Sequence, residues 1–209
     1  MENVETMMYN LADDPFDGLG NITMYSSAKA AHVIAYLALK TRDRSLDVLK
    51  AIKLVYLADR ENILRYALPI LDEPRAALPQ GPVNSRTYDR VKGEVEASDP
   101  AWSAILSDRA NHRIAVKDTV VEADLDELSD AEIETLDAIW DRFGHMSQWQ
   151  LVKWTHQAEN VPEWTDPNGS STPISLESIM EAVGIEGAAE HARFVNDIAL
   201  IRQNYSARV

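Results

Sequence analysis

The stretch that decides the fold runs from residue 53 to residue 89 and reads KLVYLADRENILRYALPILDEPRAALPQGPVNSRTYD. Its first half is apolar on several faces, which is typical of a central helix covered by its neighbours. Asp59 and Arg60 interrupt this pattern. A charge on a covered helix has to be paired or hydrogen-bonded, so the sequence predicts an internal ion pair there.

Two interpretations of Asp59 remain open at this point. In the first, its carboxylate is structural and is bonded to Arg86 or to a backbone N–H. In the second, it forms a polar pocket or interface with Gln80 and Tyr88. Either arrangement would orient the chain that follows the helix.

The second half, ALPQGPVNSRTYD, is predicted to be a rigid connector. Pro79 and Pro82 fix two φ angles, and Gly81 permits a turn conformation that a Cβ would oppose. Arg86 and Tyr88 then begin a helix against the preceding one. A phosphate site is disfavoured because Pro82 lacks the N–H that a phosphate cradle needs.

Helical periodicity dominates the rest of the chain. Capping boxes are expected at Ser129 with Glu132 and at Ser147 with Gln150. Ser45 is the expected cap of the central helix. Gly144 is expected just after a helix end. Helices are predicted over about 28–41, 45–67, 86–96, 99–109, 129–144, 147–157, 175–184 and 187–204.

One β-hairpin is predicted near residues 113–121. Ile114 and Val116 alternate with polar neighbours, and Val120 and Val121 follow a turn. No βαβ alternation appears, which argues against a doubly wound sheet. The expected fold is mainly α: a compact helical domain of about six to eight helices with one small β-hairpin.

Composition excludes several classes of function. The chain has 209 residues, no cysteine and a formal net charge of -14. Nucleic-acid binding needs clustered Lys and Arg, so the acidic balance argues against it and favours a basic protein partner. No histidine pair has metal-ligand spacing, and no metal or cofactor is expected. The acidic N-terminus is not a signal peptide, and we expect a cytoplasmic protein with no membrane partner.

Two blocks of the sequence together resemble the Panacea domain, the SocA-like antitoxin family that includes phage-associated GepA proteins. The second block is LSDAEIETLDAIWDRFGHMSQWQLVKWTHQ. Ala67 stands where the family often has glycine. The matching residues of the first block are Lys53, Leu54, Tyr56, Ala58, Asp59, Pro69, Ile70, Pro79, Gly81, Pro82, Val83 and Tyr88; those of the second are Leu128, Ser129, Trp149, Leu151, Thr155 and His156.

The resemblance implies a non-catalytic antitoxin that binds and neutralises a toxin encoded beside it. It also implies an alternative, a proteolytic adaptor that delivers the toxin to a cytoplasmic protease. A third hypothesis, an enzyme or ligand-binding protein with a polar cleft at Asp59, comes from the residues alone. The expected partner-binding residues are Asp59, Arg60, Gln80, Arg86, Tyr88 and Trp164, and the expected structural motif is Lys53, Tyr56, Pro79, Gly81 and Pro82.

The expected organisation has three parts. Residues 1–25 form a flexible arm, residues 26–165 form the Panacea domain, and residues 166–209 form a helical extension packed on it. Arms and tails of this kind add interface area when they wrap a partner. Trp164 lies close to the start of the extension and is a candidate anchor.

Overall fold

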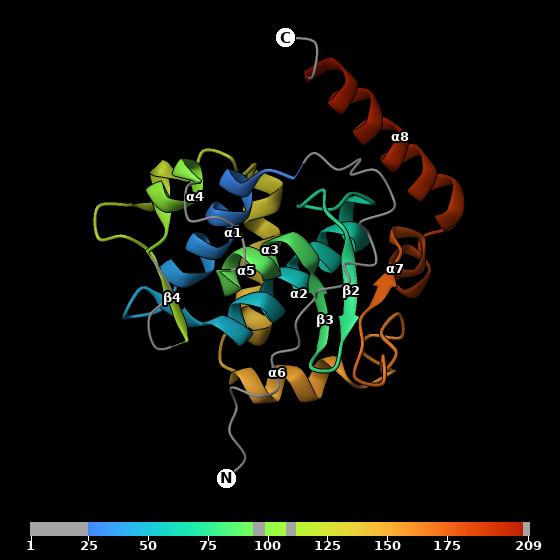
Figure 1. The fold of residues 1–209 in the computed structure, drawn as a ribbon, viewed down its shortest axis with the longest axis horizontal. Coiled ribbons are helices and arrows are strands. Elements are labelled where there is room, and N and C mark those ends of the chain that lie inside the picture. Colours follow the sequence, from blue (N-terminus) through green and yellow to red (C-terminus); the bar gives the residue numbers. More distant parts are fainter. Residues whose placement is uncertain (1–24, 94–98, 108–111, 207–209) are drawn as a thin grey trace.

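The computed structural model describes residues 25–93, 99–107 and 112–206, with side chains described as far as residue 201. The central element is helix α2 (Val48–Tyr66), and most of its residues are buried. Its neighbours are helices α1 (Ser27–Leu39), α5 (Asp130–Phe143) and α6 (Gln148–Thr155). Figure 1 shows these helices gathered around it. The further helices are α3 (Ser85–Lys92), α4 (Pro100–Ile105), α7 (Leu176–Ala182) and α8 (Ala188–Ser206).

The predicted capping boxes are both confirmed. The Ser129 N–H donates to the Glu132 carboxylate at 2.9 Å, and the Ser147 N–H donates to Gln150 Oε1 at 2.8 Å. These bonds satisfy main-chain donors that have no partner within the helix. The expected cap at Ser45 is wrong, because Ser45 belongs to a strand and α2 begins at Val48.

The described residues contain two small antiparallel sheets, whereas the sequence predicted one hairpin. Strand β1 (Ser45–Asp47) pairs with β4 (Arg113–Ala115). The predicted pairing of Ile114 with the segment after it is therefore wrong. The chain turns there, since the Val120 N–H donates to the Lys117 carbonyl, and the 3₁₀ turn Glu122–Asp124 follows. The mainly α class is confirmed.

The second sheet has the order β3–β2–β5. Its strands are β2 (Arg75–Leu78), β3 (Gly81–Asn84) and β5 (Thr172–Ile174). The connector is thus a hairpin, with Pro79 and Gln80 at its turn. Pro82 is tolerated because β3 is an edge strand, where a missing N–H breaks no ladder.

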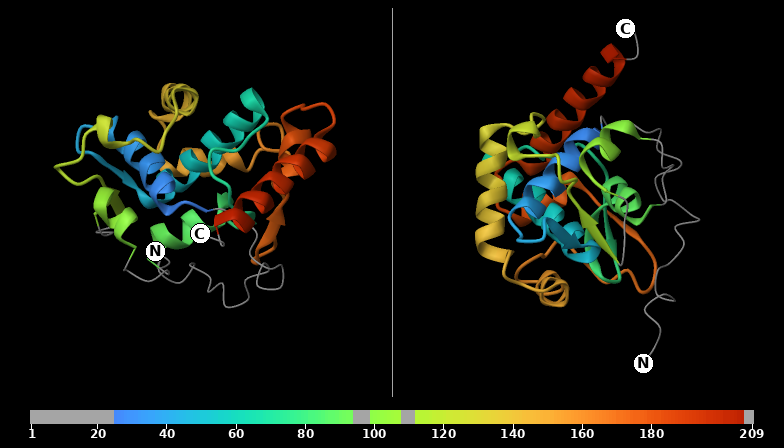
Figure 2. Two further views of the ribbon diagram at one scale, coloured as in Figure 1. Left: turned by 90° about the horizontal axis from the view of Figure 1, so that it is seen from above. Right: turned by 90° about the vertical axis from the view of Figure 1, so that its left-hand side faces the viewer.

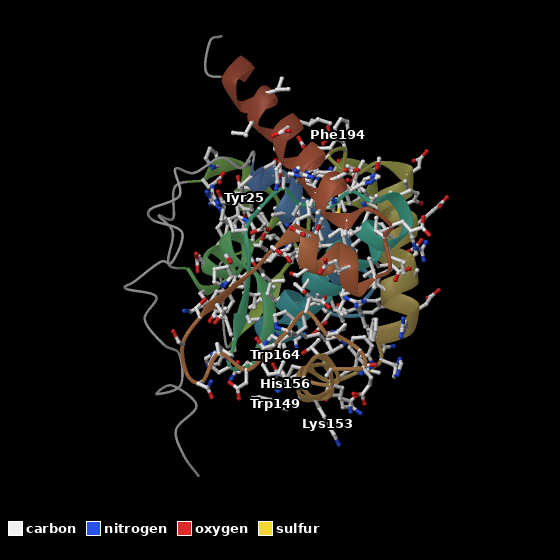
Figure 3. The ribbon with its side chains drawn as sticks, turned by 90° about the vertical axis from the view of Figure 1, so that its right-hand side faces the viewer. Tyr25, Trp149, Lys153, His156, Trp164 and Phe194 are labelled. Atoms are coloured by element: carbon white, nitrogen blue, oxygen red, sulfur yellow. The ribbon has the colours of Figure 1, made fainter. Side chains whose placement is uncertain are left out.

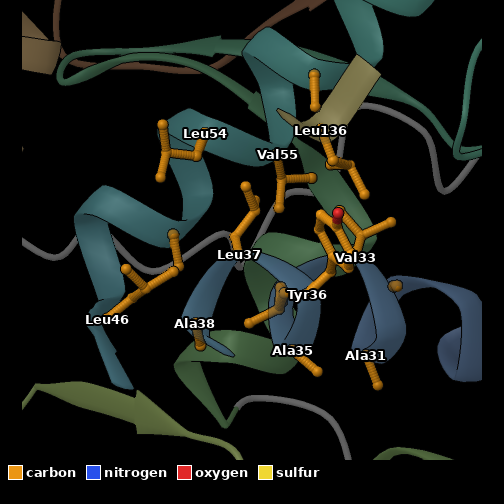
Figure 4. Packing of buried hydrophobic residues seen from close by; sticks show 14 of the residues in the cluster. Ala31, Val33, Ala35, Tyr36, Leu37, Ala38, Leu46, Leu54, Val55 and Leu136 are labelled. Atoms are coloured by element: carbon orange, nitrogen blue, oxygen red, sulfur yellow. The ribbon is translucent and has the colours of Figure 1, made fainter. Parts of the chain in front are cut away.

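Two apolar clusters form the core. The larger one joins α1, α2 and α5, and Figure 4 shows Leu37, Leu54, Val55 and Leu136 packed within it. The smaller one joins α2, β2, β5, α7 and α8. Residues 172–195 therefore pack on the rest of the chain through this second cluster. The boundary near residue 165 stays a prediction, and residues 1–24 of the predicted arm lie outside the described residues.

The outline of the molecule is uneven. Helix α8 continues past the rest of the fold, and its C-terminal half stands out from it (Figures 1 and 2). None of the described helices is both long enough and apolar enough to cross a membrane.

Candidate functional site

Asp59 lies beneath the β2–β3 hairpin with 1% of its surface exposed. One carboxylate oxygen accepts the Leu71 N–H at 2.9 Å, and the other accepts Arg75 Nε at 2.7 Å. The internal ion pair and the backbone bond are therefore confirmed, but the partner is Arg75 rather than Arg86. Strand β2 places Arg75 over α2, whereas Arg86 lies half-buried on α3.

A second buried carboxylate, Glu73, extends this network to α3. It accepts the Thr87 N–H at 2.9 Å and the Thr87 hydroxyl at 2.5 Å. Asn84 donates to both Asp59 and Glu73. Burial raises the pKa of Glu73 to about 7. The network fixes the hairpin and the start of α3 relative to α2.

The Lys53 side chain anchors the other end of the hairpin. It is fully buried, and its Nζ donates to the Pro82 carbonyl at 2.8 Å. Burial lowers its pKa to about 7. Gly81 has a φ of +99°, and a Cβ there would lie 2.7 Å from Thr155 Oγ1 and 3.0 Å from Lys53 Nζ. Close packing therefore joins β3, α2 and α6 at this point.

Tyr56 and Arg60 hold the segment after α6. Glu163, whose side chain is 0% exposed, accepts the Tyr56 hydroxyl at 2.9 Å and Arg60 Nε at 2.7 Å. Burial, and then the Glu163 charge, raise the pKa of Tyr56. Sequence analysis missed Glu163, because it lies in a segment with loop composition and 103 residues from Arg60. No local pattern links residues so far apart.

The hairpin turn carries a partly exposed surface, in which Trp164 is half-buried and held in place. Its Nε1 donates to the Leu78 carbonyl at 3.1 Å, and its ring stacks on His156 with centroids 4.2 Å apart. Gln80 is exposed at the turn beside them. Figure 3 shows Trp164 and His156 close to Trp149 and Lys153 of α6. We call these residues the hairpin-turn surface: Gln80, Trp149, Lys153, His156 and Trp164.

The buried Lys53 affects the charge of the hairpin-turn surface through His156. Burial, and then the charge of Lys53, lower the pKa of His156. The imidazole is therefore biased to its neutral form. Trp149 is 54% exposed. Aromatic side chains that are rigid and accessible dominate the energetics of protein interfaces.

The structure does not bring all predicted partner-binding residues together. Gln80 and Trp164 meet at the hairpin turn, whereas Arg86 and Tyr88 follow β3 at its far end, on α3. The Lys92 ammonium lies 4.9 Å from the Tyr88 ring centroid. Asp59 lies beneath the hairpin, so it does not line a cleft with Gln80 and Tyr88.

A metal site among the residues that the structure describes would require a cluster of metal-ligand side chains. No group of three or more His, Asp and Glu side chains there is placed to hold a metal ion. The buried carboxylates Asp59, Glu73 and Glu163 all accept hydrogen bonds from other residues of the chain.

Comparison with protein families gives a match to part of the chain. Residues 52–164 match the family described as "Antitoxin SocA-like, Panacea domain". The matched segment begins in α2, includes the hairpin and α6, and ends at Trp164. The comparison with curated proteins gave no match, and neither did the comparison with solved structures.

Proposed function

The chain belongs to the SocA-like antitoxin family with a Panacea domain, and on this premise we propose that it neutralises a protein toxin by direct binding. The toxin is the product of a neighbouring gene, and the complex forms in the cytoplasm. The role is binding rather than catalysis.

The observation that carries this proposal is the hairpin-turn surface. Trp149 is 54% exposed, and the half-buried Trp164 is fixed by its bond to the Leu78 carbonyl at 3.1 Å and by its stack on His156. The neighbouring Glu163 is held by Arg60 at 2.7 Å. A side chain that is already ordered loses little conformational entropy when a partner binds it. A rigid aromatic surface of this kind is suited to tight protein binding.

The predicted partner-binding residues then divide into two roles. Gln80 and Trp164 contact the toxin, and Arg86 and Tyr88 on α3 offer a second contact edge. Arg60, bonded to Glu163, supports Trp164 from beneath. Asp59 fixes the hairpin from beneath. The net charge of -14 favours a basic toxin.

The first test is a growth assay in a bacterial host that lacks this locus. The neighbouring gene is induced with and without this chain. We expect the neighbour to stop growth by itself and co-expression to restore it. A neighbour that is harmless by itself, or toxicity that persists during co-expression, contradicts the proposal. Rescue that persists in a protease-deficient host supports neutralisation by binding, and rescue that is lost there supports delivery to a protease.

The second test asks whether the hairpin-turn surface binds the toxin. Trp149→Ala removes a ring that is 54% exposed, and Val121→Ala is a matched control at a side chain that is 53% exposed. Val121 directly precedes the 3₁₀ turn Glu122–Asp124, in the segment after β4, and β4 lies on the other side of the molecule from α7 and α8 (Figure 1). Truncating an interface anchor costs about 2 kcal/mol or more, so Trp149→Ala should weaken toxin binding by about 30-fold or more. Equal affinities for the two variants would contradict the assignment of the surface.

A further inference from the structure

Helix α8 has two apolar faces, and the fold covers one of them. Ala188, Ala192 and Val195 pack into the second apolar cluster. Phe194 and Ile201 are 62% and 58% exposed. They belong to a second face, which the fold leaves open.

Phe194, Ile198 and Ile201 occupy positions i, i+4 and i+7, so they align along one side of the helix. Ile198 is half-buried between the two exposed side chains. We call these three residues the α8 stripe. Single exposed apolar side chains are normal on a protein surface, but three at this spacing form the pattern by which an amphipathic helix enters an apolar groove.

The described side chains of α7, of α8 and of the segment between them are mostly acidic where they are charged. Within the described side chains of residues 176–201, the single Lys or Arg is Arg193, and its Nε donates to the Ala189 carbonyl on the same helix. The exposed acids of this segment are Glu177, Glu181, Glu186, Glu190 and Asp197. A complementary partner therefore has an apolar groove with a basic rim.

We propose that the toxin holds α8 in such a groove, with the α8 stripe as its anchor. This inference rests on the proposed function and adds a second contact to it. Figure 3 shows Phe194 toward the α8 end of the molecule and Trp149 and Trp164 together toward the opposite end, and Figure 1 shows α7 between α8 and the hairpin. A single partner lying across α7 meets both surfaces. A second copy of this chain is disfavoured as the occupant, because chains with a net charge of -14 repel each other.

The test is the double variant Phe194→Ala with Ile201→Ala, compared with Val121→Ala in the full-length chain. The exposed positions and the high helix propensity of alanine preserve the fold, and circular dichroism verifies it. We expect the affinity for the toxin to fall at least about tenfold in the double variant and to remain unchanged in the control. Binding by the wild-type chain should weaken as salt rises. Ile201→Lys, which introduces a like charge facing the basic rim, is an independent second variant and should also weaken binding.

The outcomes are distinguishable. If the wild-type chain does not bind the toxin, the proposed function and this inference both fail. If the wild-type chain binds and the stripe variants bind within about twofold of it, the inference is overturned while the proposed function stands. If the stripe variants instead convert a wild-type dimer to a monomer without changing toxin affinity, the occupant is a second copy and the inference is again overturned.

Discussion

The replacement of Gly81 by alanine tests the packing that fixes the hairpin. Gly81 has a φ of +99°, and the added Cβ would lie 2.7 Å from Thr155 Oγ1 and 3.0 Å from Lys53 Nζ. Forcing an L-residue into a left-handed conformation costs about 1–2 kcal/mol. Overpacking a close-packed site costs about 1–3 kcal/mol more. We therefore expect Gly81→Ala to lower the free energy of unfolding by about 2–5 kcal/mol.

A matched control separates the two contributions. Gly184 has a φ of +84°, and a Cβ there would have no atom within 4 Å. Gly184→Ala should therefore show the backbone strain alone, about 1–2 kcal/mol. The difference between the two variants measures the packing around Gly81.

The free energy of unfolding of both variants should be measured by urea unfolding, followed through tryptophan fluorescence. Calorimetry should also be used, since each kcal/mol of lost unfolding free energy lowers the Tm by about 2–4 °C in a chain of this size. Thr155→Ala, made alone and with Gly81→Ala, removes the nearest atom. The double-mutant cycle should then show a coupling of about 1 kcal/mol or more. If Gly81→Ala costs no more than Gly184→Ala, or if the coupling is absent, the packing argument is refuted.

Three further changes test the buried charges and the end of α2. Asp59→Asn leaves the buried Arg75 without its carboxylate and should cost about 3–5 kcal/mol in the free energy of unfolding; a loss below about 1 kcal/mol would show that the ion pair is not structural. Ala67 has a φ of +55°, so Ala67→Gly should raise the Tm by relieving about 1 kcal/mol of strain, and a lower Tm would contradict this. Because Lys53 has a pKa of about 7 in the folded chain, the unfolded chain binds more protons above pH 7. The stability of the wild type relative to Lys53→Met should therefore rise between about pH 7 and 10.5, and a difference in unfolding free energy that stays constant with pH would contradict the burial argument.

Local patterns in the sequence predicted most of the helices. Helices α5 and α6 begin where their capping boxes predict, because a cap depends on residues only three positions apart. The structure also explains why the family often has glycine at the position of Ala67. Ala67 adopts the left-handed conformation at the end of α2, which glycine adopts without strain.

Long-range pairing could not be predicted in the same way. Strand β4 pairs with the much earlier strand β1, with Leu46 opposite Ile114, and no local signal specifies that choice. The β2–β3 hairpin was missed because Pro79 and Pro82 were interpreted as connector residues. A proline on an edge strand obeys a different rule, and an edge is known only once the sheet order is known.

For the candidate site too, the sequence predicted individual residues but not the partners that lie far away in the chain. The sequence indicated that Asp59 must be paired and that Trp164 was a possible anchor. It did not identify Arg75 or Glu163 as partners, because both ion pairs join separate elements. Two residues of the predicted site, Gln80 and Trp164, lie together only because the hairpin turn meets the segment after α6.

Strand β5 determines where the chain can be shortened. It covers the free edge of β2, pairing Arg75 with Ile174 and Ala77 with Thr172. A fragment that stopped at residue 164, where the family match ends, would leave that edge bare and would uncover the second apolar cluster. A bare edge beside apolar side chains is a template for adding foreign strands. We therefore expect such a fragment to aggregate, and we expect the matched residues alone to be too short for a stable fold.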